Sequence, residues 1–282
     1  MNVSWLEKKL GENFTVKIDE NPDYLIYNVY SNDDRNPKYS SKNPIRISFF
    51  TENVMADINY ADYIIGPYHI NYLDRYFKYP TFLLQDFSDI EKIRNEALKT
   101  KRKKFCAAVI SNCLAKFRLN FIKELSKYKK VDMGGRCMNT LNHTVENKIK
   151  FLSSYKFSIA MENSEGDFYI SEKIVDSFKA GTIPIYYGDY MIDEFINPKS
   201  YILIKGEKDL KKKIEYIKKI DKNDSLYESI MKEKPLIDKK FKNKIDGKEL
   251  ISFLQNIFMQ DKNMAYRRDN NYYDFYCNKS NN

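Results

Sequence analysis

The chain of 282 residues is poor in the residues that build metal sites and disulfide frameworks. It has two histidines, His69 and His143, and its four cysteines lack the paired CxxC spacing of zinc ligands. This pattern argues against a zinc site and favours reduced thiols, as in a cytosolic protein. Cys106 lies in an apolar segment typical of a buried strand, so we expect a small core residue there. The other cysteines are Cys113, Cys137 and Cys277.

Long hydrophobic runs are also lacking. No apolar stretch approaches the roughly 20 residues that a transmembrane helix needs. The first ten residues carry Trp5 and several charges but no apolar core of a signal peptide, so we expect no secretory signal. Together with the cysteine pattern, these absences predict that the protein is located in the cytoplasm. A position at the inner face of the cell membrane is compatible with this prediction.

Acidic residues are fewer than basic ones. The chain has 48 lysines and arginines against 39 aspartates and glutamates, a formal net charge of +9. Such an excess is typical of proteins that bind nucleic acid, an anionic membrane surface or an anionic substrate. A general bias of the sequence toward lysine also produces it. The basic residues are dispersed and no nucleic-acid motif is present, so we expect no nucleic acid partner and at most weak peripheral membrane association. The basic run 101–104 has two interpretations. It could attract phosphate or a membrane, or it could be a solvated linker between two domains, and the second interpretation is favoured.

One stretch, from Lys156 to Asp189, has the pattern of a βαβ unit. Residues 156–161 alternate and then run apolar, as in a strand buried in a parallel sheet. Ser171 is a candidate cap for a helix with apolar residues at helical spacing, and Gly181 is expected to end that helix. Residues 182–187 then predict a second buried strand.

Polar residues follow the first of these strands, where a ligand is expected. Open α/β sheets bind ligands outside the carboxyl ends of their strands, next to helix N-termini. Tyr169, Glu172 and Lys173 fall at that place, beside Asn163. The alternative interpretation is that Glu172 and Lys173 form a solvated first helical turn.

The rest of the chain alternates between expected strands and helices, which predicts an α/β fold. Strands are expected at residues 14–18, 24–30, 45–50, 62–65 and 105–110, and residues 131–135 are expected to form a short strand followed by a glycine turn. Helices are expected at residues 4–11, after Asn112, at 143–155, at 205–221 as an amphipathic surface helix, and after Asp246.

Three segments of the sequence resemble the donor-binding signature of glycosyltransferase family 10, the α1,3/4-fucosyltransferases. They are YKFSIAMEN, YISEKI and AGTIPIYYGD, in the order and spacing of the family. The resemblance covers residues 23–246 and is strongest from 105 to 204. It implies a GT-B fold, in which two Rossmann-like domains face a central cleft. It also implies an inverting transfer of fucose from GDP-fucose to a glycan that contains N-acetylglucosamine, such as a lipopolysaccharide side chain.

The resemblance also implies roles for individual residues. Glu52 matches the proposed general base, although the glycine that usually precedes this glutamate is absent. Arg118 matches an arginine that contacts the donor diphosphate, and Lys173 is the second cation for the departing phosphate. The remaining expected donor contacts are Asn163, Tyr169, Glu172 as a partner of sugar hydroxyls, and the glycine turn Gly134–Gly135, where backbone approaches the nucleotide.

We expect an acceptor-side domain over residues 1–103, a GDP-sugar-binding domain over 104–260 and a polar tail over 261–282. No DxD-like pair follows a strand, so no metal is expected to be required, and a divalent cation would at most stimulate the reaction. Two alternatives remain open. One is a transferase for another nucleotide sugar on the same scaffold, and the other is a degenerate module that binds glycan or nucleotide without catalysis.

Overall fold

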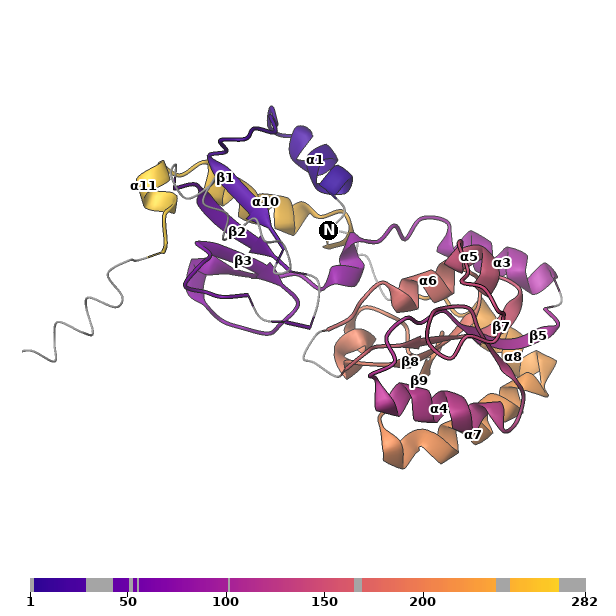
Figure 1. The fold of residues 1–282 in the computed structure, drawn as a ribbon. Coiled ribbons are helices and arrows are strands. Elements are labelled where there is room, and N and C mark those ends of the chain that lie inside the picture. Colours follow the sequence, from indigo (N-terminus) through magenta and orange to yellow (C-terminus); the bar gives the residue numbers. More distant parts are fainter. Residues whose placement is uncertain are drawn as a thin grey trace, which may run out of the picture. The chain divides into compact units, whose positions relative to one another are not determined.

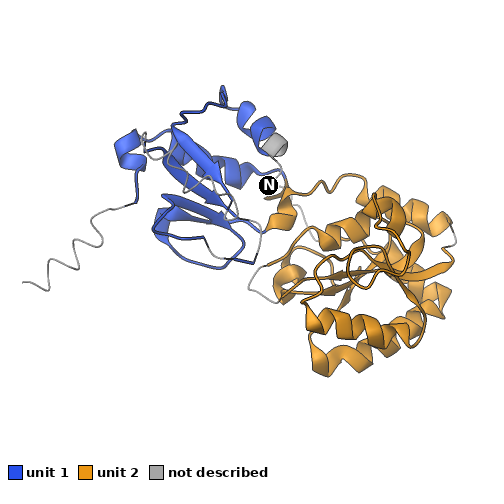
Figure 2. Ribbon diagram, viewed as in Figure 1, with its two compact units in different colours: residues 1–80, 246–282 blue, residues 81–245 orange. Residues whose placement is uncertain are grey.

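The chain folds into two compact units, each with its own sheet (Figure 1). The computed structural model describes residues 3–28, 43–50, 53–54, 56–100, 102–164, 169–236 and 244–268. Unit 1 comprises residues 1–80 and 246–282, and unit 2 comprises residues 81–245 (Figure 2). Within the described ranges, no helix combines the length and apolar character that a membrane span needs.

Unit 1 is built on a four-stranded parallel sheet in the order β1-β2-β3-β4. Every residue of β2 is buried, including Arg46 and Ser48, which alternate with its three apolar residues. Helix α10 buries Leu250, Leu254 and Ile257 at helical spacing, and its Phe253 stacks on Phe77 at 4.9 Å between ring centroids. The elements are α1 (Val3–Gly11), β1 (Tyr24–Tyr27), β2 (Ile45–Phe49), β3 (Tyr63–Gly66), η2 (Leu73–Arg75), β4 (Tyr76–Lys78), α10 (Lys248–Phe258) and α11 (Lys262–Ala265).

The buried carboxylate of Asp62 fixes the end of the described chain to unit 1. It accepts hydrogen bonds from the backbone N–H groups of Arg46, Arg267 and Arg268 at 2.7–2.9 Å. The guanidinium of Arg268 also lies 2.9 Å from it. The expected polar tail therefore belongs to the fold of unit 1 as far as Arg268, and residues 269–282 lie outside the described residues.

Unit 2 is built on a five-stranded parallel sheet in the order β6-β5-β7-β8-β9. Helices α4 and α7 cover one face of the sheet, and α3, α5 and α6 cover the other (Figure 1). The elements are η3 (Thr81–Leu84), α3 (Ile90–Lys99), β5 (Lys104–Ala108), α4 (Lys116–Ser126), β6 (Val131–Met133), α5 (Lys148–Leu152), β7 (Tyr155–Met161), α6 (Lys173–Lys179), β8 (Ile183–Tyr187), η4 (Tyr190–Glu194), β9 (Ile202–Leu203), α7 (Glu207–Asp221) and α8 (Asp224–Lys232).

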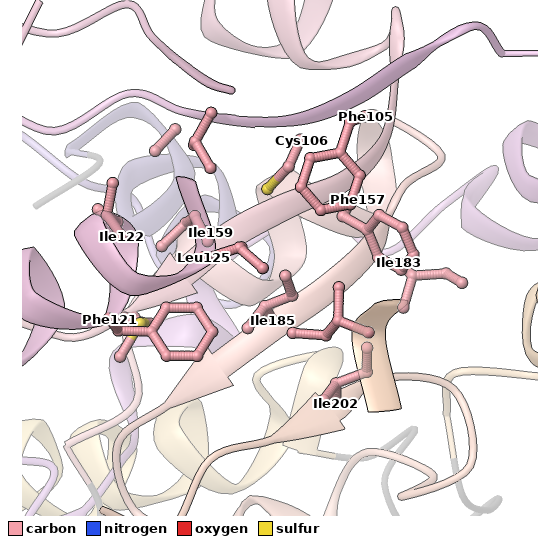
Figure 3. Packing of buried hydrophobic residues seen from close by; sticks show 14 of the residues in the cluster. Phe105, Cys106, Phe121, Ile122, Leu125, Phe157, Ile159, Ile183, Ile185 and Ile202 are labelled. Carbon is pink, nitrogen blue, oxygen red and sulfur yellow. The ribbon is translucent and has the colours of Figure 1, made fainter. Parts of the chain in front are cut away.

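The main hydrophobic core of unit 2 lies between the sheet and the helices α4 and α7. Phe121 and Leu125 of α4 pack there with Phe157 and Ile185 of the central strands (Figure 3). Cys106 is a free, fully buried thiol in this cluster, as its apolar context predicts. Burial of these apolar side chains is the main source of stability for the sheet of unit 2. Polar residues follow the carboxyl ends of its strands.

The predicted domain boundary after residue 103 is wrong, because α3 belongs to unit 2. Arg94 on α3 is 1% exposed and donates to the carbonyl oxygens of Thr182, Ile230 and Met231 at 2.7–3.3 Å. These bonds join α3 to the end of α8 and to the start of β8. The boundary lies instead between Pro80 and Thr81, and the chain returns to unit 1 for α10.

The basic run is not a solvated linker, since Arg102 is built into unit 2. Its guanidinium donates to the carbonyl oxygens of Tyr155 and Ala180, both at 2.9 Å. The second of these bonds caps the end of α6. Lys103 and Lys104 are exposed, and Lys101 lies outside the described residues.

Other local predictions hold in part. Helix α5 is shorter than the expected helix 143–155, and residues 14–18 form no strand. The structure adds β4, α3 and α8, which the sequence patterns did not indicate.

Candidate active site

The strand order of unit 2 identifies the place where a ligand is expected. Strands β6 and β7 flank β5 on opposite sides, so the direction of winding reverses between β5 and β7. Ligands of doubly wound sheets bind outside the carboxyl ends of the two strands at such a switch point. The residues there are the loop from Val109 to Ala115, the first turn of α4, and Glu162 and Asn163 after β7.

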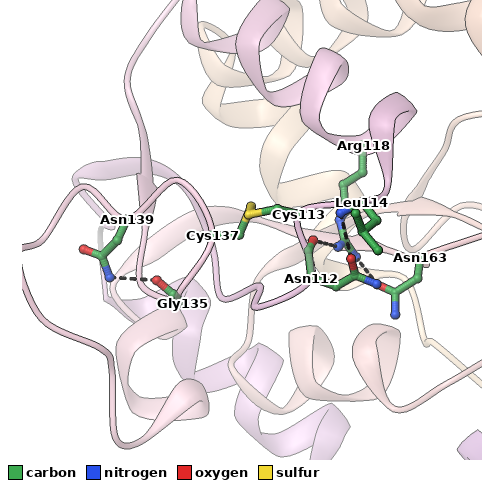
Figure 4. Close-up of a disulfide and its surroundings, with 8 residues drawn as sticks. All are labelled: Asn112, Cys113, Leu114, Arg118, Gly135, Cys137, Asn139 and Asn163. Carbon is green, nitrogen blue, oxygen red and sulfur yellow. Dashed lines mark hydrogen bonds between the residues drawn. A yellow bond between two sulfur atoms is a disulfide. The ribbon is translucent and has the colours of Figure 1, made fainter.

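Arg118 joins these two strand ends. Its Nη1 donates to the carbonyl oxygen of Met161 at 3.1 Å. Nη1 also donates to Oδ1 of Asn163 at 2.7 Å, and Nη2 donates to the carbonyl oxygen of Asn112 at 2.8 Å (Figure 4). Arg118 lies in the first turn of α4, on the same buried side of the helix as Phe121. The structure thus brings Arg118 and Asn163, two of the expected donor contacts, within hydrogen-bond distance of each other.

The charge of Arg118 is held by neutral groups. The residue is 1% exposed, and burial lowers the pKa of its guanidinium, while Glu162 and Tyr169 act in the opposite direction. The acceptors that the described part of the chain offers it are two backbone carbonyls and one side-chain amide. Its Nε is buried and makes no hydrogen bond within the described residues. Such an arginine is oriented by the fold and retains N–H donors for an anion, as phosphate recognition requires.

Lys173 pairs with a buried glutamate that sequence reasoning left without a role. Its Nζ lies 2.7 Å from Oε2 of Glu162 and 2.8 Å from Oγ of Ser171. Burial alone would lower the pKa of the Lys173 ammonium, but Glu162 and Glu172 outweigh it, and the pKa is raised. Lys173 is therefore a firmly charged cation whose charge is largely offset by Glu162, so Arg118 is the stronger centre for an anion.

Glu162 also organises the start of α6. The carboxylate is fully buried and accepts hydrogen bonds from the backbone N–H of Ser171 at 2.8 Å and from its hydroxyl. Ser171 was expected to cap the helix, but α6 begins at Lys173, with Glu172 at the cap position and no side-chain cap bond. A glutamate placed directly after a buried strand is the sequence signal that could have indicated this role.

The remaining donor-pocket candidates differ in exposure. Glu172 is 47% exposed at its side chain and lies 3.9 Å from Nζ of Lys173. Burial raises the pKa of the Glu172 carboxyl, but attraction to Lys173 and Lys148 prevails and the pKa is lowered, so the group is an ionised acceptor. Tyr169 is buried, at 2% exposure, and interacts electrostatically with Arg118.

Gly134 and Gly135 are accounted for by packing of the protein against itself. A Cβ on Gly135 would collide with the carbonyl oxygen of Ile110, and one on Gly134 would lie 2.5 Å from Cγ2 of Val145. Both glycines are buried. The close approaches at this turn are therefore to the loop after β5 and to Val145, and a contact between these glycines and a nucleotide stays a prediction.

The expectation of reduced thiols is wrong for two cysteines, because Cys113 and Cys137 form a disulfide. They are 24 residues apart in sequence, and the bond joins the loop after β5 to the loop after β6 (Figure 4). Spacing in a sequence does not reveal such pairing. Since disulfides are typical of oxidising compartments, the cysteines no longer support the cytoplasmic location, which stays a prediction.

Loss of this disulfide should weaken nucleotide binding. Cys113 follows Asn112, whose carbonyl orients Arg118, so freeing the loop loosens one of three contacts of the guanidinium. We expect the double variant Cys113→Ser, Cys137→Ser to lose about 3 kcal/mol of unfolding free energy. Its affinity for GDP should fall about threefold to tenfold, since loosening one hydrogen bond between the guanidinium and a backbone carbonyl costs roughly 1 kcal/mol. Calorimetry and urea unfolding measure the two effects.

Dithiothreitol provides the control for that prediction. The reductant should lower GDP affinity of the unmodified protein and leave the double variant unchanged. A Cys106→Ala variant, which keeps the disulfide, should respond to the reductant as the unmodified protein does. Equal affinity of the oxidised protein and the double variant would show that the disulfide has no part in positioning Arg118.

Removing the charge of Glu162 should destabilise unit 2. Glu162→Gln keeps an acceptor for Ser171 but leaves Lys173 without its buried partner. We expect a loss of about 2 kcal/mol in unfolding free energy, less than for a fully enclosed pair because Lys173 is 17% exposed. Glu172→Gln is the matched control, and this exposed carboxylate should contribute less than about 0.5 kcal/mol. Urea unfolding followed by circular dichroism measures both variants. Equal losses of unfolding free energy in Glu162→Gln and Glu172→Gln would contradict a stabilising role for the pair of Glu162 and Lys173.

The expected roles of Glu52 and of a metal ion are not tested by the geometry of this site. Glu52 lies outside the described residues, as does the segment 165–168 beside Tyr169. Among the residues that the structure describes, no three His, Cys, Asp or Glu side chains are grouped so as to hold a metal ion. The expectation that no metal is required stays a prediction.

The chain is similar in structure to solved glycosyltransferases. A crystal structure of an alpha1,3-fucosyltransferase with GDP-fucose matches it with a TM-score of 0.74 and 26% sequence identity, over 91% of this chain and 85% of the other. With a parallel sheet and flanking helices in each unit, the fold is of the GT-B class.

Comparison with protein-family models also relates the sequence to fucosyltransferases. Residues 99–265 match the C-terminal part of glycosyltransferase family 10 (fucosyltransferase), and residues 2–87 match the N-terminal domain of the alpha-(1,3)-fucosyltransferase FucT. The chain therefore belongs to glycosyltransferase family 10, as the resemblance of its three segments predicts.

Individual relatives show how far the similarity extends. The Alpha-(1,3)-fucosyltransferase FucT of Helicobacter pylori is 28% identical over 292 residues, which cover 89% of this chain and 61% of the relative. The GDP-fucose protein O-fucosyltransferase 3 of Xenopus laevis is 33% identical over 146 residues, 48% of this chain and 30% of the relative. The chain thus spans about three fifths of the first relative and less than a third of the second.

Proposed function

We propose that this protein transfers L-fucose from GDP-fucose to a hydroxyl of a glycan that contains N-acetylglucosamine, in α1,3 or α1,4 linkage and with inversion at the anomeric carbon. The observation that carries the proposal is Arg118, a buried cation at the switch point whose described acceptors are all neutral. Membership of a fucosyltransferase family and similarity to a structure with GDP-fucose support the choice of donor.

The first requirement of the reaction is to stabilise the leaving diphosphate. Negative charge grows on the phosphate oxygens as the bond to the fucose carbon breaks, and fixed cations stabilise it best when they need no rearrangement. Arg118 meets this condition because three hydrogen bonds already orient it. Lys173 adds a second cation, with Nζ held by Glu162 and Ser171.

The second requirement is to hold the donor sugar in a reactive orientation. The exposed, ionised carboxylate of Glu172 can accept hydrogen bonds from two vicinal hydroxyls of ribose or fucose, which fixes the ring. Asn163, whose Oδ1 accepts from Arg118, makes no hydrogen bond through its amide N–H groups within the described residues, and these groups can bind the donor. Tyr169 completes the pocket on the side of Arg118.

The third requirement is a base for the attacking hydroxyl. We assign this role to Glu52 in unit 1, on the resemblance of the segment Phe49–Asn53 to the family. The acceptor hydroxyl loses its proton to this carboxylate and attacks the anomeric carbon as GDP leaves from the other side, which inverts the configuration. The acceptor itself is proposed to be an oligosaccharide such as a lipopolysaccharide side chain.

A transfer assay tests the proposal. The protein is incubated with GDP-fucose and a panel of N-acetyllactosamine and lacto-N-biose acceptors, and the new bond is located by NMR. We expect a fucosylated product with one linkage favoured. Transfer only from another nucleotide sugar would support the same-scaffold alternative, and GDP binding without transfer to any acceptor would support a binding module.

A further inference from the structure

The net charge of the chain is concentrated in two segments of unit 2. Residues 116–130, which contain α4, and residues 205–222, which contain α7, hold 14 basic and 5 acidic residues, a net charge of +9. The other 249 residues hold 34 basic and 34 acidic residues and have no net charge. A general lysine bias would spread the excess along the chain, so it does not explain this distribution.

The two segments lie side by side on one face of unit 2. Helices α4 and α7 pack against each other over the same face of the sheet (Figure 1). The hydroxyl of Tyr128, just after α4, donates to Asp221 at the end of α7 at 3.0 Å. Lys218 and Lys222 both lie 5.6 Å from the ring of Tyr128. The charges of both segments therefore form one surface.

Most lysines of this surface have no acidic partner. Four lysines of the two helices and the loop after α4 pair with carboxylates of the same surface, namely Lys127, Lys129, Lys213 and Lys218. Eight further lysines are exposed and, within the described residues, make no ion pair, and we call them the α4–α7 lysine face: Lys116, Lys123, Lys205, Lys208, Lys211, Lys212, Lys219 and Lys222.

The spacing of these lysines follows the solvent side of each helix. Lys116 and Lys123 lie two turns apart on α4, and Lys208, Lys212 and Lys219 follow one line along α7. Tyr216, which is 38% exposed, lies on that same line between Lys212 and Lys219. The opposite sides of both helices are buried in the core. A helix of 15 residues is about 22 Å long, so the face is long and broad.

We propose that the α4–α7 lysine face docks on a lipid bilayer that contains anionic headgroups. Lysine ammonium groups are point charges that lack the planar, bidentate geometry of a guanidinium, so a row of them matches a diffuse negative surface. The two segments expose no arginine that could bind an anion in a bidentate way. An exposed tyrosine among lysines suits the headgroup layer, where its ring and its hydroxyl are both accommodated. Apart from Lys116, in the first turn of α4, the surface lies outside the proposed donor site, and the inference holds whether or not the proposed transfer is correct.

Vesicle sedimentation tests the proposal with the full chain. Phosphatidylcholine vesicles with and without phosphatidylglycerol are mixed with the protein at low and high salt. We expect binding only to the vesicles with phosphatidylglycerol, and release at high salt, because screening shortens the reach of exposed charges. The triple variant Lys123→Gln, Lys212→Gln, Lys219→Gln should bind about 100-fold more weakly, since each lysine near an anionic bilayer contributes about fivefold.

A matched variant separates the face from total charge. The control Lys92→Gln, Lys99→Gln, Lys150→Gln removes three exposed lysines from α3 and α5, on the other face of the sheet. It should keep the affinity of the unmodified protein for vesicles, and both variants should keep GDP binding as a measure of intact folding. Equal losses in the two variants, or no binding to anionic vesicles at low salt, would overturn the proposal. Tighter binding to single-stranded RNA than to vesicles, lost in the first variant, would replace the bilayer by a nucleic acid.

Discussion

Arg118→Ala is expected to lower the affinity for GDP by about 10³-fold, as measured by calorimetry. Two charge-assisted hydrogen bonds to phosphate oxygens contribute together about 4 kcal/mol. The effect is large because no carboxylate among the described residues pairs with Arg118, while the charge of Lys173 is offset by Glu162. Binding of guanosine, which has no phosphate, should not change.

Two further variants separate charge, geometry and folding. Arg118→Lys keeps the charge but loses the planar fork, so it should recover only part of the affinity. Lys116→Ala removes an exposed cation two residues earlier in the same turn and should leave GDP affinity unchanged. If Arg118→Ala bound GDP as tightly as the unmodified protein, with both folded, the diphosphate would bind elsewhere.

Glu52→Gln is expected to lower the turnover of fucose transfer by about 10²–10⁴-fold, the usual contribution of a positioned general base. Glutamine has nearly the same shape but cannot take the proton of the acceptor hydroxyl. The affinity for GDP should stay the same, because the diphosphate cations of the proposal lie in unit 2. Steady-state rates with saturating GDP-fucose, together with GDP calorimetry, measure both quantities.

The control for this variant is another carboxylate of unit 1. Glu249→Gln changes an exposed glutamate in the first turn of α10 and should leave the turnover unchanged. Unchanged turnover in Glu52→Gln would remove this residue from the mechanism and assign the base to another group. A loss of GDP affinity equal to that of Arg118→Ala would instead indicate that Glu52 acts on the donor.

Local patterns in the sequence predicted the part of the fold that carries the proposed donor site. The expected strand 156–161, the helix ended by Gly181 and the strand 182–187 correspond to β7, α6 and β8 within a residue or two. Gly181 has the positive φ of 64° that the end of a helix favours in glycine. Periodicity and turn chemistry depend on neighbours in the chain, so one sequence reveals them.

Contacts between distant parts of the chain were the features that local patterns did not reveal. The boundary of unit 2 depends on Arg94, whose acceptors Ile230 and Met231 come more than 130 residues later. The disulfide and the pairing of Glu162 with Lys173 likewise depend on where loops meet in space. The family resemblance supplied Arg118 and Lys173, but only the structure showed that one is held by neutral groups and the other by a buried carboxylate.

A crystal structure of the protein with bound GDP tests the central claim most directly. The account predicts that the diphosphate lies outside the carboxyl ends of β5 and β7, with phosphate oxygens within hydrogen-bond distance of the guanidinium of Arg118 and near Nζ of Lys173. A diphosphate bound at any other place, with the bonds of Arg118 to Asn112, Met161 and Asn163 unchanged and no phosphate near it, would contradict the account.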